Sequence, residues 1–191
     1  MRCILWLIWI LLVCEVHAQE PDKVEFERRV SPKDVPLSAR NWIEEVYGDP
    51  GKIRWYLEQN ERGFSYEAKF KWNHKQHSVE FSEAGDIEDI EILIHWDQIP
   101  IRARTRIEDY FKEHYKRHKV RRVQYQLTGA QTELRQVIHD ETMTGVTVRF
   151  EIEFSGKSPE RKSLWEALFD RHGNFIRVRR IRISPTDNLR Y

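Results

Sequence analysis

Apolar and polar residues alternate over most of this chain, and that period of two restricts the fold more than any other feature of the sequence. Between Phe64 and Trp72 every second residue is aromatic or alanine, while the residues between them are polar. Successive side chains of a β-strand point to opposite faces, so this pattern predicts antiparallel strands with one buried face and one polar face. We expect such strands in eight segments: residues 53–57, 64–72, 77–81, 87–96, 123–127, 146–154, 165–169 and 175–183.

Two segments with helical spacing of apolar residues divide these strands into two groups of four. The first follows Pro36 and runs to Tyr47, and the second follows Pro100 and runs to Tyr115. Proline suits the first turn of a helix, because the N–H group that it lacks would have no partner there. The sequence therefore predicts an α+β fold, made of two tandem copies of a helix packed on a four-stranded antiparallel sheet.

The expected organisation has five parts along the chain, and the insertion in the fourth part is expected to form a long hairpin. The parts are a signal peptide (1–18), a flexible tether (19–34), the first helix-plus-sheet repeat (35–98), the second repeat with an insertion at 129–145 (99–184) and a C-terminal tail (185–191).

The first eighteen residues have the arrangement of a secretory signal peptide. Arg2 supplies a positive charge, residues 4–13 are apolar without interruption, and Val16-His17-Ala18 fits a cleavage site before Gln19. The apolar run is shorter than the about 20 residues of a membrane-spanning helix, and no later segment is long and apolar enough to be one. An alternative is a lipoprotein signal acylated at Cys14. We expect an exported protein, periplasmic or secreted, whose mature chain has no transmembrane segment.

Short sequence motifs resemble those of a known family. They are Val35-Pro36, Tyr66-Glu67-Ala68-Lys69-Phe70 and Phe81-Ser82-Glu83-Ala84-Gly85-Asp86, each with a second copy later in the chain. Together they resemble the tandem repeats of PepSY-like exported proteins, which are also described as having a β-lactamase-inhibitor-protein-like fold. The resemblance covers about residues 35–183 and implies a small bacterial protein that binds or restrains other proteins. It brings no catalytic motif with it.

Residue patterns for catalysis or metal binding are weak. His74 and His77 are separated by two residues, but alternation places His74 in a hairpin turn and His77 on the apolar side of a strand. His114 and His118 would share a helical face, yet neither pair has an evident third ligand. Both cysteines fall in the predicted signal peptide, and no Gly-x-Ser-x-Gly elbow is present. The sequence therefore predicts no enzyme, no cofactor and no metal site.

Charge also limits the partners. The chain has 32 Lys and Arg against 31 Asp and Glu, and this balance argues against nucleic acid as a partner. Two local basic runs, at residues 116–122 and 177–182, have two interpretations. They are either ordinary solvated surface or a patch that binds an anionic partner.

The polar side of the expected sheets gives the sharpest hypothesis about binding. A surface that mixes tyrosine, charged and apolar side chains is typical of protein interfaces. Alternatively, Leu164 and Leu168 pack the two repeats together. The candidate partner-binding residues are Arg54, Tyr56, Glu67, Lys69, Lys71, His95, Leu164 and Leu168.

These observations favour an exported, non-enzymatic binding module that engages a protein or peptide of the bacterial envelope, with a regulatory or inhibitory role. The alternative function is a periplasmic carrier or sensor of a small anionic ligand or a metal ion.

Overall fold

The structure is a computed structural model that describes residues 23–60, 63–140, 142–157 and 162–183. The expected signal peptide with Cys14 and the expected C-terminal tail lie outside the described residues.

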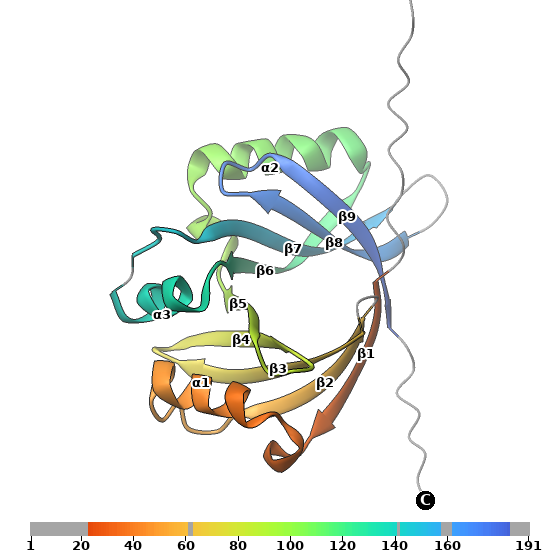
Figure 1. Ribbon diagram of the computed structural model, residues 1–191. Coiled ribbons are helices and arrows are strands. Elements are labelled where there is room, and N and C mark those ends of the chain that lie inside the picture. The colour runs from red at the N-terminus through yellow and green to blue at the C-terminus, as the bar shows by residue number, and fades with distance from the viewer. Residues whose placement is uncertain (1–22, 61–62, 141, 158–161, 184–191) are drawn as a thin grey trace, which may run out of the picture.

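Nine strands form one sheet whose two ends meet (Figure 1). Each strand pairs in antiparallel fashion with the next one along the chain, and β1 closes the ring by pairing in parallel with β9. The strands are β1 (Lys23–Val30), β2 (Arg54–Asn60), β3 (Gly63–Trp72), β4 (Lys75–Ser82), β5 (Ile87–Leu93), β6 (His118–Thr128), β7 (Thr147–Lys157), β8 (Lys162–Asp170) and β9 (Phe175–Ile183).

The described residues contain three α-helices, and all of them lie outside the ring (Figure 1). The helices are α1 (Leu37–Tyr47), α2 (Ile101–His114) and α3 (Gln131–Asp140), and short 3₁₀ turns η1 (Pro32–Asp34) and η2 (Trp96–Gln98) precede α1 and α2. Within the described ranges, no helix has both the length and the apolar character needed to cross a membrane.

The apolar side of the sheet packs against these helices in two separate clusters. In the first, Trp42 of α1 makes edge contacts with Tyr47 and with Phe81 of β4, and buried residues of α3 complete the cluster. In the second, Phe111 of α2 packs against Phe154 of β7, with ring centroids 4.7 Å apart. The outer side of the ring is therefore the hydrophobic core of the protein.

The predicted α+β fold of two tandem helix-on-four-strand copies is wrong. The residues that the structure describes form a single nine-stranded sheet, almost entirely antiparallel, with three short α-helices. β5 pairs directly with β6, from Ile90–Leu127 to Leu93–Gln124, so the two expected sheets are continuous. Alternation identifies the two faces of a strand but not its neighbours, and an edge strand with unpaired N–H and C=O groups gains hydrogen bonds by pairing.

Two segments also differ locally from the expectation. Residues 23–30 of the expected tether form β1, which supplies the strand that closes the ring. The expected hairpin at 129–145 contains α3 instead. Leu134, Val137 and Ile138 have helical spacing and are all buried, so burial of one helix face explains the difference.

Two turns contain glycines with a positive φ, and only one of these glycines lies against a helix. Gly173, in the turn between β8 and β9, has a φ of +82°, and a Cβ there would overlap the carbonyl oxygen of Ala103 in α2. Gly51 has a similar φ of +77°, but nothing lies within 4 Å of the position its Cβ would take. Both glycines adopt a positive φ, which strains any other residue. Only at Gly173 is there also no room for a Cβ atom.

We therefore expect Gly173→Ala to lower the free energy of unfolding by about 3 kcal/mol and Gly51→Ala by about 1 kcal/mol. Both variants carry the strain of a positive φ, and only the first must also move the start of α2. Urea unfolding followed by circular dichroism measures both. If both variants lose the same free energy of unfolding, the Cβ added at position 173 does not collide with α2.

Candidate functional site

The polar side of the sheet faces into the ring, because the helices cover the other side (Figure 1). We call this surface the inner polar face. Several of its charged or amide side chains are almost fully enclosed: Glu166 and Gln124 are each 2% exposed. Its described members include Tyr56, Glu58, Glu67, Lys69, Glu80, Asp89, Glu91, Arg122, Gln124, Gln126, Glu151, Glu153, Glu166, Leu168 and Arg179.

Strand register places carboxylates side by side on this face. Glu67 of β3 lies opposite Glu80 of β4, and Glu80 lies opposite Asp89 of β5. Like charges directly opposite one another destabilise a sheet unless protons or cations compensate them. The inner polar face therefore needs internal partners for its acids.

Lys69 is the main cation of the β2–β4 region. Its Nζ lies 2.6 Å from Glu67 Oε2 and 3.1 Å from Glu27 Oε1. The same nitrogen lies 4.9 Å from the ring centroid of Tyr56. Burial lowers the pKa of Lys69, but the adjacent carboxylates raise it overall, so the ammonium stays charged.

Glu58 completes this group by holding a proton. Burial and then Glu67 raise the pKa of Glu58 to about 10, so at neutral pH Glu58 is protonated and donates to Glu67. Burial opposes ionisation of Glu67, yet hydrogen bonds from Glu58, Lys69 and Ser78 bring its pKa below the usual value. One carboxyl therefore keeps a proton while its neighbour stays ionised.

Three carboxylates in this region, from Glu27, Glu58 and Glu67, offer oxygen atoms that all lie within 4.8 Å of one another. Such a group suits a hard cation in principle. Here the ammonium of Lys69 and the proton of Glu58 already compensate its charge. A metal ion at this place would have to displace both.

Asp89 lies in the same row across the sheet as Glu80 and Glu67. Burial and then the carboxylates of Glu80 and Glu151 raise its pKa well above the usual value. The Nε2 of Gln126 donates to Asp89 Oδ2 at 3.1 Å. In the same way, Ser65 donates to Glu80 at 2.7 Å. The amides and hydroxyls of neighbouring strands thus serve as donors to these acids.

Arginine takes the place of lysine in the second half of the ring. Arg179 Nη2 lies 3.1 Å from Glu166 Oε1, and Arg122 Nη1 lies 3.3 Å from Glu153 Oε1. Chemically, the inner polar face is a network whose acids are held by protons, cations and donors of the same chain. Catalytic sites also contain carboxyl pairs whose pKa values differ, as those of Glu58 and Glu67 do. Here, however, the two carboxyl groups bind each other and side chains of the same protein, such as Lys69.

The eight predicted partner-binding residues differ in exposure. Glu67 and Leu168 are buried, at 8% and 2% exposed, and Lys69 and Leu164 are partly buried. Tyr56 is half-buried, whereas Arg54, Lys71 and His95 are exposed. Leu168 lies opposite Glu151 and Arg177 in the sheet. Whether any of the eight binds a partner stays a prediction.

Several members of the network were not predicted from the sequence. Asp89, Gln124, Gln126 and Glu151 are buried polar residues that were not among the candidates. A signal was present, since Glu151 lies between the apolar Phe150 and Ile152. The closure of the ring, which the pattern does not reveal, is what turns such positions from surface into interior.

The four histidines considered as possible metal ligands lie in different surroundings. His77 is buried on the helix side, where Tyr47 Oη lies 3.3 Å from its Nδ1, and burial and then Lys75 lower its pKa to about 4. His74 lies in the β3–β4 turn with a φ of +65°. The expected shared helical face of His114 and His118 is absent, because α2 ends at His114 and β6 begins at His118.

No protein-family model matches the chain, and no curated protein sequence matches it. Solved structures do match. A DUF2874 family protein from Bacteroides ovatus has 11% identity and a TM-score of 0.51, over 76% of this chain and 87% of that chain. A Bacteroides eggerthii protein assigned provisionally to the periplasm has 15% identity and a TM-score of 0.51, over 76% and 88%. These two proteins share the fold.

A BLIP-like protein from Bacteroides fragilis also matches, with 11% identity and a TM-score of 0.48, over 82% of this chain and 92% of that chain. The resemblance to PepSY-like proteins and their tandem repeats stays a prediction.

We expect Lys69→Met to lower the free energy of unfolding at pH 7 by about 3 kcal/mol, because Glu27 and Glu67 lose their shared cation inside the ring. The control is Lys112→Met on α2, whose ion pairs are largely exposed and worth about 0.5 kcal/mol at most. Urea unfolding measures both variants. If the two losses are equal, Lys69 is not a structural cation.

We expect Glu58→Gln to make stability less dependent on pH. The folded protein holds the proton of Glu58 to a pKa of about 10, and the unfolded chain releases it near 4.5. The stability that this proton contributes is therefore complete below about pH 4.5 and is lost as the pH rises toward 10. Glutamine keeps a donor for Glu67 and has no proton to lose.

The variant should gain roughly 1–3 kcal/mol over the original protein at pH 9 and little at pH 5. Urea unfolding at pH 5, 7 and 9 measures this, with Glu83→Gln in an exposed turn as the control. Parallel pH curves for Glu58→Gln and the original protein would contradict the assignment of the proton.

Proposed function

We propose that the chain is an exported, non-enzymatic binding module that engages a protein or peptide of the bacterial envelope, with a regulatory or inhibitory effect on it. Export is supported by the signal-peptide pattern of residues 1–18. It is also supported by the provisional periplasmic assignment of the Bacteroides eggerthii protein that shares the fold.

The observation that carries the proposal is an exposed rim at one open end of the inner polar face. We define this rim as Arg54, Lys71, Gln76 and Leu93. Arg54 begins β2, Lys71 lies near the end of β3 opposite Gln76 of β4, and Leu93 ends β5. Leu93 is 39% exposed although it is a large apolar residue.

The chemistry of the rim favours an acidic partner. Among the residues that the structure describes, neither Arg54 nor Lys71 has a carboxylate in ion-pair distance. Two uncompensated cations beside an exposed leucine suit an interface in which acidic groups surround an apolar contact. Lys69 and Glu67 lie further inside and are occupied with each other, so they support the ring rather than contact the partner.

The experiment compares Arg54→Glu/Lys71→Glu with the exposed control Lys112→Glu/Arg171→Glu, in a tagged mature chain starting at Gln19. Each is incubated with the envelope fraction of the organism that makes the protein, and bound proteins are quantified by mass spectrometry. A partner purified from this step is then titrated by biolayer interferometry at two salt concentrations.

We expect the rim variant to bind the partner at least about tenfold more weakly and with less salt dependence, because the interaction loses two cations and gains repulsion. The control should bind as the original protein does. Equal binding by the two double variants would contradict the rim as the docking surface.

A further inference from the structure

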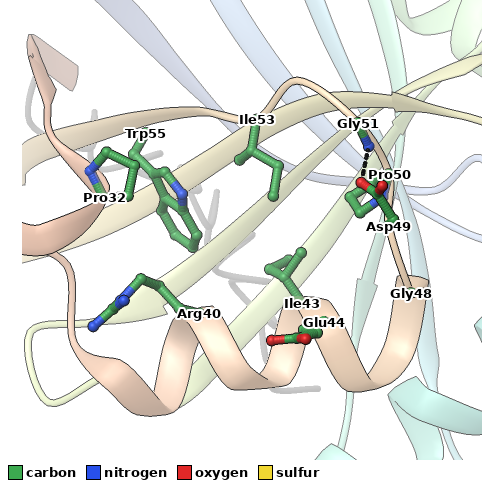
Figure 2. Close-up of a pocket in the computed structure, with 10 residues that line it drawn as sticks. All are labelled: Pro32, Arg40, Ile43, Glu44, Gly48, Asp49, Pro50, Gly51, Ile53 and Trp55. Carbon is green, nitrogen blue, oxygen red and sulfur yellow. Dashed lines mark hydrogen bonds between the residues drawn. The ribbon is translucent and has the colours of Figure 1, made fainter.

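A second candidate site lies on the outer side of the sheet, away from the inner polar face. It is a groove between α1 and the start of β2, with a cavity volume of about 480 Å³ (Figure 2). Ile43 of α1 points from below toward Ile53, and Trp55 of β2 points down beside them. The volume falls in the range of small-ligand pockets. The residues beneath the groove are apolar, but Ile43 and Trp55 are only 1% and 3% exposed, so Ile53 is the one of these three that a ligand can reach.

Opposite charges flank this apolar floor. Arg40 lies at the end near η1, while Glu44 and then Asp49 lie toward the other end (Figure 2). Arg40 and Glu44 are four residues apart on α1, which places them about 6 Å apart along the helix axis. In this order the two side chains pair less well than Glu before Arg would.

Arg40 keeps donors available for a ligand. Its Nε donates to the carbonyl oxygen of Val35 at 3.3 Å, which fixes the guanidinium at the end of the groove. Within the described part of the chain, no carboxylate lies in ion-pair distance of the guanidinium nitrogens of Arg40. At the other end, Asp49 Oδ1 accepts from the Gly51 N–H at 2.9 Å, and this bond orients the carboxylate.

We propose that this groove binds a short free peptide of two or three residues with apolar side chains. The peptide carboxylate pairs with the guanidinium of Arg40, its ammonium group lies toward Glu44 and Asp49, and its side chains lie over the partly exposed Ile53 and Pro50. Guanidinium binds carboxylate with two parallel hydrogen bonds, and the acidic end attracts the ammonium group.

The spacing of the charged residues along the groove favours a short peptide over other ligands. An extended chain spans about 3.3–3.6 Å per residue, so two residues cover the about 6 Å between the Cα atoms of Arg40 and Glu44. A third residue allows for the outward reach of Arg40, whose guanidinium points away from Glu44 (Figure 2). A single amino acid holds its two charges too close together. A fatty carboxylate leaves the acidic end without a partner, and an internal segment of a protein has neither terminal charge.

The test is isothermal titration of the mature chain with L-leucyl-L-leucine and with two blocked forms, the N-acetyl peptide and the C-terminal amide. We expect one molecule bound per chain, with the amide at least about tenfold weaker and the acetyl form about threefold weaker, because Glu44 is exposed. No binding up to about 10 mM by the folded protein would overturn the proposal.

Matched substitutions locate the site, because α1 and α2 carry the same residue types at corresponding positions. Arg40 and Glu44 are the fourth and eighth residues of α1, and Arg104 and Glu108 are the fourth and eighth residues of α2. We expect Arg40→Gln to weaken binding at least about tenfold and Glu44→Gln about threefold, with Arg104→Gln and Glu108→Gln unchanged.

Two further results would contradict the proposed peptide site. Binding that Arg40→Gln leaves unchanged would place the peptide elsewhere and overturn the assignment. Binding weakened by amidation but not by acetylation would overturn the peptide class and leave a simple carboxylate site. The proposal does not depend on the rim, since the titration uses no protein partner, and capture by the rim variants leaves Arg40 and Glu44 unaltered.

Discussion

The protein depends on how its sheet compensates acids that face inward. The helices need the apolar side of every strand, so the polar side is left to line the ring. In that enclosed space a carboxylate is stable only with a proton, a cation or hydrogen-bond donors beside it. Glu67 has the cation of Lys69 beside it, and Glu58 keeps its proton. In the second half of the ring, Arg179 pairs with Glu166.

The sheet therefore has two buried sides with different physical roles. The outer side gains stability from aromatic packing, as Trp42 and Phe111 show. The inner side gains little from burial, but its hydrogen bonds and ion pairs are directional and so favour one strand register over its alternatives. The two proposed binding surfaces lie where these sides end, at the open rim and beside α1.

Much of the local structure could be predicted from the sequence. The alternation at 64–72 corresponds to β3, and the proline-led segments correspond to α1 and α2. The single sheet could not be predicted, because β5 pairs with β6 across a long connection and no local pattern encodes that pairing. Closure of the ring could not be predicted either, because β1 lies in the expected tether. The groove beside α1 was also missed, since Arg40 and Trp55 belong to elements whose relative placement is tertiary.

Closure by β1 also has a consequence for the order of folding. β1 pairs with β9 through Lys23–Ile181 and the two following residue pairs, so the first and last strands must meet. A chain made from its N-terminus can complete every hairpin before this contact, but not the contact itself. Closure of the ring therefore has to wait for the final strand, and until then the acids of the inner polar face keep access to water and carry a smaller burial penalty.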